Sequence, residues 1–127
     1  KRVLDRMADA IHCQKFEGKY GCSVSTAGGS FAQEVVDYQN SVLQILGATT
    51  VGGVDVVLGP DPSALVPAEK KAYDLGGLLV NAIRSRTRYP DQDLMHAGMK
   101  ERMRALVSYN KDIWVHEYAY WNEKGGQ

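Results

Sequence analysis

The chain has 127 residues, 44% of them hydrophobic and 24% charged, and its 15 Lys and Arg balance its 15 Asp and Glu. This length suits one domain with one core, and zero net charge argues against a nucleic-acid binder, which normally carries a basic excess. Two cysteines are too few for a disulfide scaffold. The composition is not that of a disordered chain, and every apolar run is too short to span a bilayer.

Residues 1–12 carry apolar side chains at helical spacing. Val3, Met7 and Ile11 fall on one face, and charged residues occupy the opposite face. The pattern predicts one helix that runs from the first residue without an N-cap, as though it began upstream.

A short strand is predicted over residues 19–25, and its small residues on both faces suit a parallel sheet that is covered on both sides. Residues 26–29 are typical of a flexible turn. Ser30 is expected to cap the next helix, because Gln33 stands in the capping-box position. Gly47 is expected to end that helix.

The second half of the chain predicts another strand and two helices. The β-branched stretch 48–58 predicts the strand, in which Gly52-Gly53 indicates a bulge or a close backbone approach. A helix is expected from Pro67 to about residue 85. Gly76-Gly77 in its middle suggests close packing against a neighbour, or a kink. The stretch 95–109 predicts the last helix.

Methionines and aromatic residues mark the end of the chain. Met95, Met99 and Met103 form a stripe that is expected in the core or at an interface. The aromatic tail 113–121 is expected to pack over a neighbouring face or a partner subunit.

The order of elements predicts an α/β fold, because strands that alternate with helices pair in parallel. Two parallel strands are too few for a stable sheet, since parallel sheets need several strands with covered faces. Further strands are therefore expected to come from elsewhere, or to have escaped detection.

The strongest candidate for a binding site is the loop after the first strand. It lies at the carboxyl end of a parallel strand, where open α/β sheets bind ligands. Its glycines let a ligand approach the backbone, and the next helix offers unpaired amides with a positive dipole. Such a loop suits a phosphate, a flavin edge or a nucleotide ring, although a plain turn has the same local pattern. The six residues are Ser25, Thr26, Ala27, Gly28, Gly29 and Ser30.

No other residues form a recognisable catalytic or metal-binding pattern. His12, His96 and His116 share no metal-ligand spacing, and Cys13 and Cys22 are not a C-x-x-C pair. Nothing in the sequence ties a serine to a histidine. We therefore expect neither a metal site nor a side-chain catalyst.

Several segments, in order and spacing, resemble the NAD(P)H-dependent FMN reductase-like proteins of the flavodoxin-like superfamily. Residues 1–7 (KRVLDRM) resemble that family's L-K-x-x-x-D-R helix, and residues 18–21 resemble the entry into its fourth strand. Residues 25–30 look like the loop that lies against the flavin ring. Residues 46–53 resemble the run into the last strand. Residues 118–125 are similar to C-terminal tails of the iron–sulfur-flavoprotein-like branch.

The resemblance implies a three-layer αβα domain with a parallel sheet, of which residues 1–127 would be the C-terminal portion, lacking the first three strands. It also implies an FMN-dependent NAD(P)H oxidoreductase of the flavin or quinone reductase type, in which hydride passes from nicotinamide to FMN. The backbone amides of residues 26–29 would hold the polar edge of the ring, and Asp5 and Arg6 would help shape the site. The family's FMN-phosphate loop and iron–sulfur cysteines are absent from this sequence, so the chain alone should bind FMN poorly.

The same resemblance implies a cytoplasmic homo-oligomer, a dimer or tetramer, that reduces a small-molecule electron acceptor. The alternative is a non-catalytic, oligomerising interaction module without flavin, since apolar strand edges, methionines and an aromatic tail favour association. A receiver domain is less well supported, because the sequence lacks the acidic cluster that such a domain needs.

Overall fold

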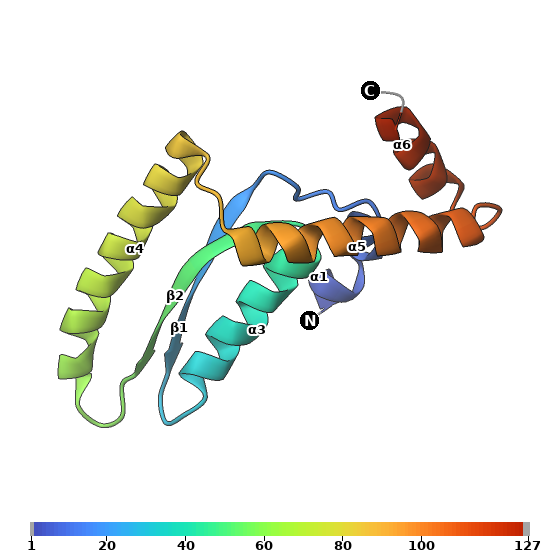
Figure 1. Ribbon diagram of the computed structural model, residues 1–127. Helices are drawn as coiled ribbons and strands as arrows, with labels where there is room; N and C mark the ends of the chain where they lie inside the picture. Colours follow the sequence, from blue (N-terminus) through green and yellow to red (C-terminus); the bar gives the residue numbers. More distant parts are fainter. Residues whose placement is uncertain (1, 126–127) are drawn as a thin grey trace.

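The computed structural model describes residues 2–125. Within them, helices and strands alternate as the sequence predicts (Figure 1). In chain order the elements are α1 (Arg2–Asp5), α2 (Ala8–His12), β1 (Tyr20–Ala27), α3 (Ala32–Ile45), β2 (Thr49–Val57), the 3-10 turn η1 (Pro62–Ala64), α4 (Leu65–Ser85), α5 (Pro90–Tyr109) and α6 (Val115–Gly125).

The two strands pair in parallel and form the sheet of the described residues. α3 and α4 lie on opposite sides of this sheet, which gives three layers (Figure 1). The α/β class and the parallel pairing are therefore confirmed. None of the helices within residues 2–125 is long and apolar enough to cross a membrane.

A bulge in β2 brings the sheet close to α3. Between Gly21 and Ser23 of β1 there is one residue, whereas the paired stretch of β2 has two residues between Thr50 and Gly53. Gly52 adopts a φ of +137°, and a Cβ on Gly53 would overlap the side chain of Val36 in α3. Both predictions for this glycine pair, a bulge and a close approach, are confirmed.

α3 ends as predicted, in a left-handed glycine. Gly47 has a φ of +105° and donates its N–H to the carbonyl of Gln44 at 2.9 Å. The N–H of Ala48 donates to the carbonyl of Leu43 at 2.9 Å, which completes a Schellman motif.

The start of α3 differs from the capping-box prediction. β1 continues through Thr26 and Ala27, two residues further than expected. The N-cap of α3 is Phe31, in a left-handed conformation with a φ of +67° and without a side-chain cap. The prediction that Ser30 caps this helix is therefore wrong, because its hydroxyl stands one residue too early to do so.

The helix predicted over residues 1–12 is divided into α1 and α2. The N–H groups of Arg6 and Met7 donate to carbonyls three residues earlier, and this tight turn interrupts the α-helix. The apolar residues on the two sides of the break contact different neighbours. Leu4 lies near α3, whereas Ile11 packs against the core formed by α5 and α6.

α4 covers one face of the sheet. Its buried residues Leu75 and Ala82 pack against Val51 and Val54 of β2. The close packing suggested for Gly76-Gly77 is wrong, because a Cβ on either glycine would meet no atom within 4 Å.

Both long C-terminal helices begin earlier than predicted. α4 begins at Leu65, so Pro67 is its third residue rather than its first. α5 begins at Pro90, where proline's missing N–H costs no helical hydrogen bond. It ends at Tyr109, as expected.

A second core joins α5 to the aromatic tail. Met103, Val107 and Trp121 are buried together. The indole Nε1–H of Trp121 donates to the carbonyl oxygen of His12 at 3.0 Å, which ties α6 to α2. The tail therefore packs over a neighbouring face of the same chain, and Met103 is a core residue, as predicted; Met95 remains 39% exposed.

Candidate functional site

The predicted binding loop lies at the carboxyl ends of both parallel strands. Ala27, the last residue of β1, pairs in register with Val57, the last residue of β2. Beyond them the two chains stay together, because Leu58 N–H donates to the carbonyl of Ala27 at 2.8 Å and Gly59 N–H donates to that of Gly28 at 3.1 Å. The loop after β1 is thus held beside the loop after β2.

The loop exposes backbone rather than large side chains. Thr26, Gly28, Gly29 and Ser30 are exposed, and Ser25 and Ala27 are partly buried. A Cβ on either glycine would meet no atom within 4 Å, so the space over this backbone is open. The next element is α3, whose first amides have no partner within the helix. A flat polar ligand could therefore contact the backbone directly.

The charges near the loop are acidic. None of the six loop residues is basic, Glu34 lies in the first turn of α3, and Asp55 pairs in register with Ser25. This arrangement disfavours a phosphate, because the two carboxylates would repel it and the loop offers it backbone amides but no cationic side chain. The edge of a neutral ring fits the same backbone without that electrostatic cost.

Asp5 and Arg6 are not brought to the loop. Both are exposed, and Asp5 belongs to a shallow hollow with Ile45 and Leu46 at the C-terminal end of α3. The loop precedes the N-terminal end of that helix (Figure 1). The structure therefore gives this charged pair a surface position rather than a role beside the loop.

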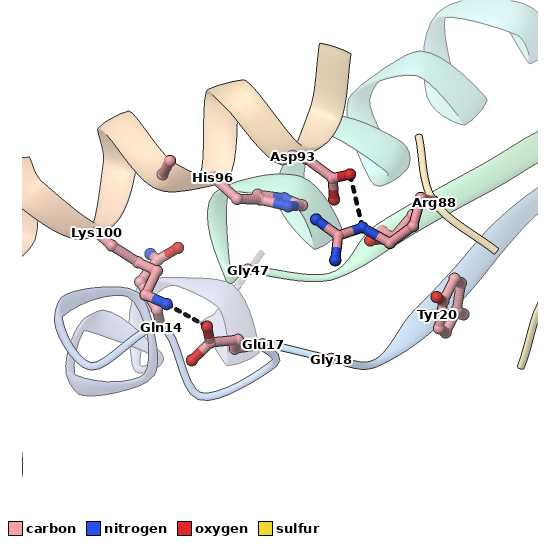
Figure 2. Close-up of a pocket in the computed structure, with 11 residues that line it drawn as sticks. Gln14, Glu17, Gly18, Tyr20, Gly47, Arg88, Asp93, His96 and Lys100 are labelled. Carbon is pink, nitrogen blue, oxygen red and sulfur yellow. Dashed lines mark hydrogen bonds and ion pairs between the residues drawn. The ribbon is translucent and has the colours of Figure 1, made fainter. Parts of the chain in front are cut away.

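A second, polar pocket lies at the opposite, amino ends of the strands (Figure 2). Its volume is about 310 Å³, and Tyr20 and Thr49, the first residues of β1 and β2, form part of its wall. Arg88 and Asp93 pair across it through Nε and Oδ2 at 2.8 Å. The remaining lining residues are Gln14, Glu17, Gly18, Gly47, His96, Ala97 and Lys100.

Two buried polar atoms in this pocket have no hydrogen-bond partner among the described residues. The first is Oε1 of Gln14, a side chain that is only 1% exposed and whose Nε2 donates to Ile11 and Ile45 carbonyls at 2.8 and 2.9 Å. The second is Nε2 of His96. Both atoms belong to side chains that line the pocket, but both are closed to solvent in the structure.

Sequence reasoning missed this pocket. Its lining comes from separate segments between residues 14 and 100, and no spacing signal links them. Its charges also cancel locally, because Lys100 pairs with Glu17 and Arg88 pairs with Asp93.

The histidines and cysteines lie apart from both sites, except for His96. No three His, Cys, Asp or Glu side chains within residues 2–125 come together as metal ligands. His12 stacks on Trp114 with ring centroids 4.2 Å apart, and His116 is exposed. Burial raises the pKa of the Cys13 and Cys22 thiols above the ordinary value, which makes both poor nucleophiles at neutral pH.

Comparisons with known proteins leave the family open. Neither the family models, nor the curated proteins, nor the solved structures that were searched include a match to this chain.

Proposed function

We propose that this chain carries the flavin-ring-binding part of a flavodoxin-like, FMN-dependent NAD(P)H oxidoreductase. The observation that carries the proposal is the open loop of residues 25–30, which presents bare backbone at the carboxyl ends of two parallel strands. The resemblance of this loop to the flavin-facing loop of FMN reductase-like proteins points to the same ligand.

In this proposal the chain binds and orients, and it supplies no side-chain catalyst. The backbone amides of residues 26–29 donate to the polar edge of the ring, and the open faces of Gly28 and Gly29 admit a planar group. The cofactor supplies the redox chemistry by taking hydride from the nicotinamide for a small-molecule acceptor. The acidic surroundings of the loop leave the phosphate to be held elsewhere.

A titration of FMN and of riboflavin, followed by flavin fluorescence, tests the proposal. We expect weak, saturable binding with affinities for the two flavins that agree within about threefold, a difference of less than 1 kcal/mol. The affinities should agree because this chain contacts the ring and not the phosphate. FMN binding that is tighter than riboflavin binding by about tenfold or more would contradict a ring-only contact.

The loop is tested with a matched pair of glycine substitutions. Gly29→Leu should weaken flavin binding by about tenfold, or 1.4 kcal/mol, because the side chain fills the space of the ring. Gly98→Leu in α5 should leave binding unchanged, although Gly98 is equally open to solvent. Equal effects of the two substitutions, or no saturable binding to the unaltered protein, would rule the site out.

A second candidate function is a non-catalytic module that self-associates. Exposed apolar side chains favour it, with Val66 70% and Tyr73 84% exposed on α4 and Tyr38 56% exposed on α3. A dimer or tetramer assembled through the helices is proposed in either case. Light scattering after size-exclusion chromatography measures the oligomer, and a colourless, stable oligomer that binds no flavin would favour this second function.

A further inference from the structure

The two outer edges of the sheet differ in how they are covered. At the edge of β2, the side-chain amide of Gln92 in α5 takes the place of a neighbouring strand. Its Oε1 accepts the N–H of Thr50 at 2.9 Å, and its Nε2 donates to the carbonyl of Thr50 at 2.8 Å. The outer edge of β1 has no strand beside it within residues 2–125.

The hydrogen bonds that β1 makes with β2 show which backbone groups of β1 face its open edge. The carbonyls of Lys19 and Ala27, at the two ends of β1, both accept N–H groups from the β2 side, at 2.9 and 2.8 Å. Backbone groups alternate in direction along a strand, so odd-numbered residues here face β2. The even-numbered residues therefore present their N–H and C=O groups to the open edge. They are Tyr20, Cys22, Val24 and Thr26.

An apolar groove of about 380 Å³ adjoins this edge. Its floor is formed by residues 22–24 of β1, and its walls include Val42 of α3 and Leu4 and Met7 of the α1 region. The groove thus lies on the α3 side of the sheet. It offers apolar contacts to one face of any strand that pairs with β1.

β1 also lacks two of the features by which proteins protect an exposed strand edge, charged residues and proline. Its eight residues, YGCSVSTA, include neither a charged residue nor a proline. Val24 is 52% exposed at the middle of the strand. An uncharged edge beside an apolar groove complements another uncharged, extended backbone.

We propose that the open edge of β1 binds an extended polypeptide segment from outside the described chain, which adds a strand to the sheet. The segment hydrogen-bonds to the even-numbered residues of β1 and places uncharged, apolar side chains at alternate positions into the groove under α1 and α3. The added strand pairs with β1 on the side opposite β2 and so extends the sheet. This inference does not depend on flavin binding by the loop.

The probe for this edge is a fluorescein-labelled synthetic peptide of alternating valine and threonine with a lysine at each end. Fluorescence anisotropy should show saturable binding of this peptide to the whole chain. A peptide with proline at every second position keeps the apolar character but cannot pair, and it should bind at least about tenfold more weakly. Equal binding of the two peptides would mean nonspecific adhesion and would overturn the proposal.

Two matched proline variants distinguish the edges of the sheet. Val24→Pro removes an N–H that faces the open edge of β1. Val57→Pro removes an N–H on the outer edge of β2, because Leu58 beside it donates toward β1. Both valines are exposed, at 52% and 40%. Val24→Pro should weaken peptide binding about tenfold, and Val57→Pro should not change it; equal effects would overturn the proposal.

Hydrogen exchange of the unaltered protein keeps the test decisive if a proline variant fails to fold. The amides of Cys22 and Val24 should exchange more slowly when the peptide is bound, and unchanged exchange there would overturn the proposal. Sedimentation of the chain without peptide tests whether a second copy of the chain occupies the open edge of β1. A dimer that Val24→Pro dissociates would show that a second copy fills the edge, which would contradict a separate strand donor.

Discussion

The side-chain amide of Gln92 hydrogen-bonds to both backbone groups of Thr50, accepting the N–H at 2.9 Å and donating to the carbonyl at 2.8 Å. This pair of contacts fixes the first turn of α5 against the outer edge of β2. Thr50 is only 7% exposed, so water cannot readily replace the amide. α5 thereby supplies hydrogen-bond partners to backbone groups on the outer edge of β2. The outer edge of β1 has no strand beside it within the described residues.

Replacing this amide should destabilise the whole domain. Gln92→Ala leaves the N–H and the C=O of a buried strand residue without their partner, and we expect a loss of about 2–3 kcal/mol. Urea unfolding followed by far-UV circular dichroism measures it. Gln33→Ala is the control, because that amide donates only to Asp37 on the exposed surface; it should cost less than about 0.5 kcal/mol. Similar costs for both variants would mean that Gln92 does not anchor α5.

Two glycine-to-alanine substitutions should change stability in opposite directions. Gly53→Ala introduces a Cβ that overlaps Val36 and lies 3.2 Å from the Ser23 carbonyl oxygen, so we expect a loss of about 1–3 kcal/mol. Gly76→Ala adds a Cβ that meets no atom within 4 Å in the middle of α4. It should stabilise the domain by about 0.5–1 kcal/mol. Thermal unfolding of the two variants checks both signs, and stabilisation by Gly53→Ala would contradict the close approach of α3.

The features that the sequence could predict are those set by the local geometry of the backbone. Gly47 is identifiable because a helix that ends in a left-handed residue favours glycine, and the Gly52-Gly53 pair is unusual within a β-branched run. The break at Met7 depends on which neighbours the two sides of the helix contact. The left-handed Phe31 depends on how far β1 stays paired with β2. Such tertiary effects leave no periodic pattern in the sequence.

The same distinction applies to the two candidate sites. The loop of residues 25–30 is contiguous, so its position after a parallel strand could be predicted from the alternation of elements. The polar pocket joins Gln14, Arg88 and His96 from separate segments. Its residues are common surface types at unrelated spacings, and only the packing of α5 over the amino ends of the strands brings them together.

Glu17 should make stability dependent on pH in the acidic range. Partial burial alone would raise the pKa of this carboxyl, but hydrogen bonds and charges from Lys100 and Lys124 outweigh it and lower the pKa below its ordinary value. A lowered pKa adds stability above the unfolded-state value of about 4.3, and this stability is lost as the pH falls through the lower folded-state value.

The variant that tests this linkage is Glu17→Gln. The side chain is 38% exposed, so screening by solvent limits the loss at pH 7 to about 1 kcal/mol. Urea unfolding across the acidic range should show that the difference in unfolding free energy from the unaltered protein disappears as the pH falls through the lowered pKa of Glu17. Asp74→Asn serves as the control, since the Lys70–Asp74 pair is more exposed. A difference that persists at low pH would contradict an ionic role for Glu17.

Trp121 should contribute to stability through its indole N–H as well as its ring. Trp121→Phe keeps an aromatic ring in the core but removes the donor to the His12 carbonyl, so we expect a loss of about 2 kcal/mol from the missing hydrogen bond and the smaller volume. Trp114→Phe is the matched control, because Trp114 is less buried and contacts the ring of His12 by stacking; it should cost less than about half as much. Urea unfolding followed by far-UV circular dichroism compares the two without relying on tryptophan fluorescence. Equal losses would show that the hydrogen bond between α6 and α2 adds nothing beyond aromatic packing.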